Sequence, residues 1–142
     1  MRIEIPKDKQ LTFEMTLPIR WGDMDALGHV NNAVYFRYLE SVRVEWLRHV
    51  GLELKQTGVG AIVVNAFCNF LTQLEYPGDL LARHYIASPG RSSFDAFVTL
   101  ARADAPDVIC AEGGATTVWF DFDTQKPAPL PDWLRAQFTA AP

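Results

Sequence analysis

The sequence has little cysteine, no long apolar run and no excess of positive charge. Its 142 residues include 2 cysteines, Cys68 and Cys110, which lie far apart and outside any Cys/His cluster, so two reduced thiols are expected. No uninterrupted apolar stretch approaches membrane-spanning length, and residues 1–10 lack the apolar core of a secretory signal. The net charge of −4, with no basic run, argues against nucleic acid as a partner. We therefore expect a soluble cytoplasmic protein with neither a membrane nor a nucleic-acid partner.

Several signatures of catalysis are also missing. The sequence has no G-x-S-x-G nucleophile motif, no phosphate-binding P-loop and no G-x-G-x-x-G fingerprint. One histidine, His29, follows two aspartates closely, but the spacing matches no known ligand set, and His49 and His84 fall in other predicted elements. We therefore expect no metal site.

The remaining composition is that of one ordinary globular domain, assigned here to residues 1–142. Hydrophobic residues make up 49% and charged residues 21% of the chain, close to globular averages. A chain of this length buries roughly two thirds of its unfolded surface, so it needs neither a disulfide nor a metal for stability.

The first part of the chain alternates like a strand and then changes to a helical period. Leu11 to Trp21 alternates apolar and polar residues, and Pro18 places this strand at an edge or gives it a bulge. From Asn32 to Val50, apolar residues recur every three or four positions, which predicts one long amphipathic helix. Asn31 or Asn32 suits its N-cap, and Gly51 suits its end.

After the helix the strand pattern returns and stays. Four further strands are predicted, at residues 61–71, 80–88, 94–103 and 108–121, and a short helix begins near residue 132. Strands joined by short turns favour an antiparallel sheet, and the single long helix beside them favours the α+β class.

The junction between the first strand and the helix is where chemistry is most expected. It delivers Asp23 and Asp25 to a helix start, where unpaired N–H groups and the positive end of the helix dipole favour negative charge. Such an end can stabilise charge that develops on a carbonyl oxygen, and a nearby carboxylate can act as base or nucleophile. The alternative is structural: both aspartates cap turns, and Gly22 and Gly28 supply unusual dihedrals.

The junction resembles the opening of acyl-CoA thioesterases of the 4-hydroxybenzoyl-CoA thioesterase-like family. The resemblance rests on residues 20–32 (RWGDMDALGHVNN), followed by Tyr35, Tyr38 and Glu40, with weaker matches at residues 76–79, 90–94 and 123–131. It implies the hotdog fold, in which an antiparallel five-stranded sheet wraps around one long central helix. It also implies a homodimer, or a homotetramer of paired dimers, with active sites at the subunit interface.

The resemblance also implies roles for individual residues. Asp25 corresponds to the family's catalytic carboxylate, and the backbone donor to the substrate carbonyl falls near Asn32. His29 has no counterpart in the family's aromatic-acyl member, and we group it with these two catalytic residues as the one that orders the loop. Substrate contacts are assigned to residues of the same junction and to one turn arginine: Gly28, Asn31 and Arg91. Arg91 is a candidate contact for a CoA phosphate, and the alternative is a solvated turn charge.

The expected activity is hydrolysis of an acyl-CoA thioester to a free acid and CoA, with CoA entering as part of the substrate and no separate cofactor. The family's aromatic-acyl member has Asp-Pro-Ala-Gly where this chain has the Asp-Ala-Leu-Gly of residues 25–28, so an aromatic substrate is not implied. The Asp-x-Asn-Pro-x-His signature of hotdog hydratases is absent.

Two alternatives to an acyl-CoA thioesterase stay open. The chain could be a non-catalytic acyl-binding hotdog protein, or a thioesterase that acts on acyl-carrier-protein thioesters. In each case the acyl chain is expected between helix and sheet, where Phe67 and Phe70 are candidate wall residues and otherwise plain core.

Overall fold

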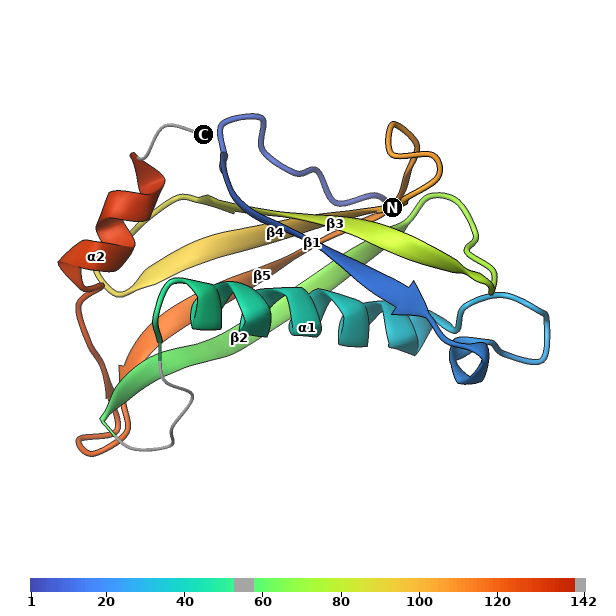
Figure 1. Cartoon of the computed structure of the whole chain (residues 1–142). Helices are drawn as coiled ribbons and strands as arrows, with labels where there is room; N and C mark the ends of the chain where they lie inside the picture. Colours follow the sequence, from blue (N-terminus) through green and yellow to red (C-terminus); the bar gives the residue numbers. More distant parts are fainter. Residues whose placement is uncertain (53–57, 140–142) are drawn as a thin grey trace.

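Five long strands form an antiparallel sheet in the computed structural model, which describes residues 1–52 and 58–139 (Figure 1). In chain order they are β1 (Gln10–Ile19), β2 (Val59–Phe70), β3 (Gly78–Ala87), β4 (Ser93–Arg102) and β5 (Ile109–Asp121). Their order across the sheet is β1-β3-β4-β5-β2, and a two-residue strand, β6 (Lys126–Pro127), also pairs with β5. The path therefore has β1 at one edge and β2 at the other.

The position of β1 explains how a proline is tolerated in a strand. Pro18 lies opposite Asp79 of β3 near the end of this edge strand. Because an edge strand has a neighbour on one side only, the missing N–H of a proline is tolerated there. The register shift in β1 occurs between Leu11 and Phe13 instead. The predicted edge position is confirmed.

Helix α1 (Asn32–His49) lies against one face of the sheet, where it contacts β1 to β4 and also passes over Gly113 of β5 (Figure 1). Its buried side chains follow the predicted period, and they are Tyr35, Tyr38, Leu39, Val42 and Trp46. Gly51, with φ of 96°, ends the helix as expected. This long helix, packed against an antiparallel sheet, gives the α+β architecture that the sequence predicts.

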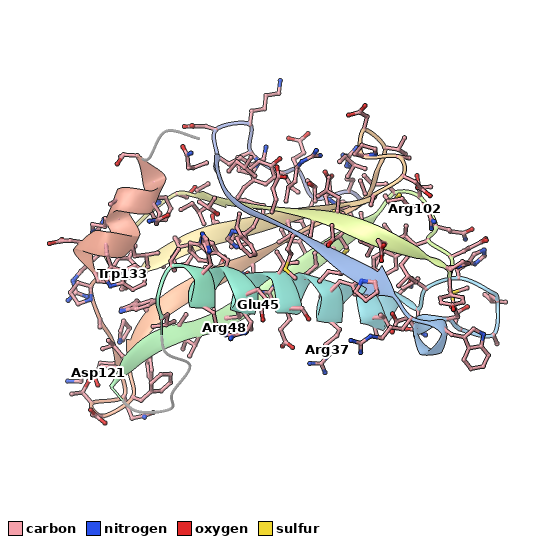
Figure 2. All side chains as sticks on the ribbon, viewed as in Figure 1. Arg37, Glu45, Arg48, Arg102, Asp121 and Trp133 are labelled. Atoms are coloured by element: carbon pink, nitrogen blue, oxygen red, sulfur yellow. The ribbon has the colours of Figure 1, made fainter. Side chains whose placement is uncertain are left out.

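The exposed side of α1 carries two ion pairs. Glu45 pairs with Arg48 at 3.0 Å, and Glu40 pairs with Arg37 at 2.6 Å. Figure 2 shows Arg37, Glu45 and Arg48 along one side of the helix. Pairs of this kind on a helix surface contribute only a few tenths of a kcal/mol each.

Two adjacent glycines in β5 let other groups approach both faces of the sheet. A Cβ on Gly113 would lie 2.5 Å from Cδ1 of Leu39, so α1 packs directly over this glycine. A Cβ on Gly114 would instead meet the ring of Phe67, at 2.6 Å. Neighbouring residues of a strand face opposite sides, so Phe67 lies on the face away from α1.

The expectation that Phe67 lines a wall between helix and sheet is therefore wrong. Its ring packs near Phe97, with 6.5 Å between the ring centroids. Phe70 is on the helix side, where it meets Tyr35 edge to face at 5.0 Å. The register of β2 against β5 decides the difference, because Phe67 pairs with Gly114 and Phe70 with Ala111.

Three short helical segments complete the described chain. They are η1 (Trp21–Asp23), α2 (Asp132–Arg135) and η2 (Ala136–Phe138). The start of α2 agrees with the predicted terminal helix. Across residues 1–52 and 58–139, no helix combines the length and the apolar character that a bilayer crossing requires.

Candidate active site

The segment between β1 and α1 folds into a tight loop anchored by Asp23. One oxygen of its carboxylate, Oδ2, accepts hydrogen bonds from the N–H of Arg20 at 2.9 Å and from the hydroxyl of Tyr38 at 2.6 Å. Burial, and next the hydrogen bond to Asp23, raise the pKa of Tyr38 far above its usual value, so the phenol keeps its proton. Asp23 therefore ties the loop to the helix, which is the structural role that the sequence offered as the alternative to catalysis.

Asp25 is half-buried and closes the next turn with one oxygen only. Its Oδ1 accepts the N–H of Leu27 at 2.9 Å and, more weakly, that of His29 at 3.4 Å. The turn requires Gly28 at φ of 82°, a conformation that favours glycine. Its Oδ2 has no hydrogen-bond partner among the residues that the structure describes. One carboxylate oxygen is thus held in place while the other remains available to a substrate or a water.

The loop closes onto the first residues of α1. Met24 forms an isolated antiparallel bridge with Val30, and the N–H of Asn31 donates to the carbonyl of Asp23 at 3.0 Å. The Asn31 side chain is the N-cap and accepts from the N–H of Ala33 at 2.9 Å. The N–H of Asn32 has no partner within the described part of the chain. This amide is free to bind an oxygen at the positive end of the helix.

His29 is joined to Asp25 through the backbone and not through its ring. The imidazole Nε2 lies 3.7 Å from Oε1 of Glu75, whereas the backbone N–H is the group that points at Asp25. The imidazole of His29 and the carboxylate of Asp25 therefore form no side-chain pair. The position of His29 suits support of the loop.

A surface cavity of about 450 Å³ opens beside Asp25 and is walled by two exposed aromatic side chains, Trp21 and Tyr76. Tyr76 belongs to the segment before β3, which the guanidinium of Arg102 holds through the carbonyls of Glu75, at 3.1 Å, and Pro77, at 2.9 Å. Arg102 is labelled in Figure 2 at this end of the molecule. A carboxylate beside aromatic walls can bind a carbonyl-containing ligand and activate a water against it.

The comparison with protein families settles which group has this junction. The model of the thioesterase-like superfamily matches residues 19–138, which include the loop, the helix and every long strand after it. This chain is a member of the thioesterase-like superfamily.

Similar proteins share most of this thioesterase-like chain. The PA2801 protein of Pseudomonas aeruginosa is 34% identical, with a TM-score of 0.86 over 89% of this chain and 98% of that one. The acyl-acyl carrier protein thioesterase ATL3 of Arabidopsis thaliana is 29% identical over 88% of this chain, which spans 66% of that protein's length. The 1,4-dihydroxy-2-naphthoyl-CoA thioesterase Slr0204 of Synechocystis is 18% identical with a TM-score of 0.80, over 89% and 95% of the two chains, which shows a shared fold. The hotdog fold and the family expected from the junction motif are confirmed.

Within one thioesterase-like protomer, the structure does not bring Arg91 to the junction. β1 ends at Ile19 opposite Gly78, whereas Arg91 follows the other end of β3, so it lies at the opposite end of the sheet from Asp25. Its carbonyl accepts from Arg135 at 3.1 Å and its side chain is exposed. Within one chain, Arg91 therefore lies apart from Asp25.

The residues that hold the far wall of the site were not predicted from the sequence. Glu75, Tyr76 and Arg102 lie in a loop and at a strand end, where no periodic pattern marks them. The only signal was the Tyr-Pro-Gly turn at residues 76–78, which resembled the family's turn into the next strand.

Proposed function

We propose that this protein hydrolyses acyl-CoA thioesters and that Asp25 is the catalytic carboxylate. The observation that carries the proposal is that the segment leading into α1 holds an Asp25 oxygen and an Asn32 amide that both lack a partner among the described residues. Membership of the thioesterase-like superfamily supports the reaction type. The names of the relatives, which include thioesterases of acyl-CoA and of acyl carrier protein, support a thioester substrate.

The reaction needs only the thioester and one water. The amide of Asn32 polarises the thioester carbonyl while Asp25 removes a proton from the water that attacks the carbonyl carbon. The new C–O bond forms as the C–S bond breaks, and the proton on Asp25 passes to the departing thiolate. If Asp25 attacks directly, it forms a mixed anhydride that a water then hydrolyses, with the same products. In both routes CoA is a product and no cofactor takes part.

We propose further that the active enzyme is a homodimer paired along β2. This edge strand has 12 residues and carries exposed apolar side chains along its length: Val59, Val63, Val64 and Phe70. A long apolar edge strand is a template for pairing with another strand, and it is rarely left open in a stable protein. A second copy is the partner that supplies a matching edge, through an isologous two-fold contact.

The direction of β2 indicates what such a dimer brings together. The start of α1 lies over the Phe70 end of β2, as the Tyr35–Phe70 contact places it, while Leu47 lies near the Ala61 end. Antiparallel pairing of two β2 strands sets the Phe70 end of one copy beside the Val59 end of the other. The Asp25 of each copy then faces the far half of its partner's helix and the end of the sheet that carries Arg91.

The direct test is release of free CoA from a panel of acyl-CoAs of short, medium, long and aromatic acyl groups. We expect hydrolysis of at least one member, with free thiol followed by a colorimetric reagent. Binding without turnover of any acyl-CoA would instead favour the non-catalytic acyl-binding alternative. Light scattering on the same sample gives the assembly, with a dimer, or dimers paired as a tetramer, as the expected result.

A second candidate substrate is an acyl group carried by acyl carrier protein, because the ATL3 relative has that activity in its name. Such carriers are acidic, and this chain carries a net charge of −4, which disfavours their docking unless a local basic patch offsets it. Comparing kcat/KM for one acyl group on free CoA and on the carrier protein separates the two substrates. We expect the higher value with CoA.

A further inference from the structure

A second cavity lies between the C-terminal half of α1 and the sheet, away from Asp25 of the same chain. It has a volume of about 340 Å³ and opens beside the β2 edge, where Ala61 and Val63 form part of its wall. Phe94 and Ala96 of β4 supply further apolar wall, and Leu47 covers it from the helix. Its size falls within the range of small-molecule pockets, and a water occupies only about 30 Å³ of liquid volume.

Two polar side chains that line this cavity are fully buried and unsatisfied. His84 has no exposed surface and Trp46 is 1% exposed, and the two rings stack with 4.5 Å between centroids. Neither Nε2 of His84 nor Nε1 of Trp46 has a hydrogen-bond partner within the described residues. A buried polar atom left unpaired costs about 1–3 kcal/mol, so two in one cavity indicate that a ligand supplies the missing bonds.

The surroundings of His84 indicate which hydrogen bonds are missing. The hydroxyl of Thr12 donates its single proton to the carbonyl of His84 at 3.2 Å, and it lies 2.8 Å from the ring Nδ1. The tautomer with the proton on Nδ1 is the one that satisfies both Thr12 contacts together, and it leaves Nε2 as an acceptor. Burial, and next the charge of Arg43, lower the pKa of His84 to about 3, so the ring is neutral near pH 7.

The lining of the cavity includes the polar side chains of Glu40, Arg43 and Thr117. Two buried polar atoms of the lining lack a partner among the described residues: Nε2 of His84, an acceptor, and Nε1–H of Trp46, a donor. A hydroxyl group both donates and accepts and can satisfy the two together, whereas an alkyl group leaves both unpaired. We propose that this cavity binds the far end of the acyl group and selects acyl groups that carry a hydroxyl there. His84 and Trp46 are then specificity-determining residues of the thioesterase.

This inference rests on the proposed function and on pairing through β2. Within one chain, Glu40 to Leu47 line the cavity about 12 to 22 Å along the helix from Asn32, too far for a short acyl group. A second copy paired along β2 brings its own Asp25 toward this half of the helix. The thioester then sits at the Asp25 of one copy while the acyl end enters the cavity of the other.

Matched acyl-CoA pairs test the proposal: hexanoyl-CoA against 6-hydroxyhexanoyl-CoA, and octanoyl-CoA against 8-hydroxyoctanoyl-CoA. We expect kcat/KM to be at least about tenfold higher for the hydroxylated member of at least one pair. The reason is that an unsubstituted acyl group leaves two buried polar atoms without hydrogen bonds. Trp46→Phe keeps an aromatic ring but removes the donor, so it should reduce this preference several-fold. Trp119→Phe, another buried tryptophan outside this cavity, is the control and should keep the preference.

The outcomes separate this inference from the proposed function. The hydroxyl selection is overturned if the unsubstituted members are hydrolysed with equal or higher kcat/KM and Trp46→Phe does not change the ratio of kcat/KM between the members of a pair. The thioesterase assignment stays intact in that case. A crystal structure of Asp25→Asn with 6-hydroxyhexanoyl-CoA that shows only water in the cavity would overturn the hydroxyl selection as well. No hydrolysis of any acyl-CoA contradicts the proposed function itself.

Discussion

Asp23 and Asp25 stand two residues apart and have different surroundings. Asp23 directs one carboxylate oxygen to two donors, the Arg20 N–H and the Tyr38 hydroxyl, and thereby fixes the loop. Asp25 uses one oxygen in its own turn and leaves the other unpartnered among the described residues. The sequence could place both aspartates at the helix start but could not separate their roles, because the difference depends on which donors the folded loop brings to each oxygen.

His29→Ala tests whether the histidine acts through its backbone or through its ring. The ring faces Glu75, and the N–H that approaches Asp25 is retained in alanine, so we expect a loss in kcat well below the roughly hundredfold that removal of a general base costs. Steady-state kinetics on the best acyl-CoA measure it. A loss equal to that of Asp25→Asn would make the imidazole part of the chemistry.

The buried His84 predicts a pH dependence of stability. Its folded pKa of about 3 lies below the usual histidine value of 6.5, so between these values the unfolded chain binds a proton that the folded chain does not. His84 makes its full contribution to the free energy of unfolding above pH 6.5. That contribution declines as the pH falls, by about 2 kcal/mol between pH 7 and pH 5. The neighbouring charge is Arg43, which disfavours protonation as well.

Urea unfolding of the wild type and of His84→Phe at the two pH values isolates this contribution. Other titrating groups are common to both proteins, so the free energy of unfolding should fall more steeply with decreasing pH in the wild type. Equal slopes in the two proteins would show that the ring titrates normally in the folded state.

Among the elements, the helix and the strands follow directly from the residue pattern. The apolar period of α1, its Asn31 cap and its Gly51 end are all local features, so sequence alone located them. The side on which Phe67 lies was not predictable, because it depends on the β2–β5 register and on the bulge between Val63 and Asn65. A shift of one residue in register moves a side chain to the opposite face.

The edge strand β2 carries the next prediction. Val64 is 56% exposed near the middle of β2, so two-fold pairing would place the two copies of a substituted side chain close together. Val64→Lys should therefore weaken the dimer through like-charge repulsion and produce monomer in light scattering at low salt. Val108→Lys, at a similarly exposed valine outside the strands, is the matched control and should stay dimeric. An unchanged assembly in the Val64 variant would exclude pairing along β2.

In the whole molecule, the two proposed halves of the substrate site lie at opposite ends of one helix. Asp25 and the Asn32 amide lie at its start, and the cavity with His84 and Trp46 lies beside its last turns. The sequence could identify the first half because its motif is contiguous. It could not identify the second, since a lone histidine in an alternating strand has the same pattern as a buried core residue. The other residues that line this cavity come from four further elements, α1, β2, β4 and β5.

The most direct test of this account is kcat/KM of Asp25→Asn on the best acyl-CoA substrate, measured beside Asp79→Asn, an exposed aspartate at the same end of the sheet. We predict that Asp25→Asn lowers kcat/KM by at least about a hundredfold while its unfolding and assembly match the wild type. The Asp79 variant should keep wild-type activity. Turnover by Asp25→Asn within a few-fold of the wild type would contradict the assignment of Asp25 as the catalytic carboxylate.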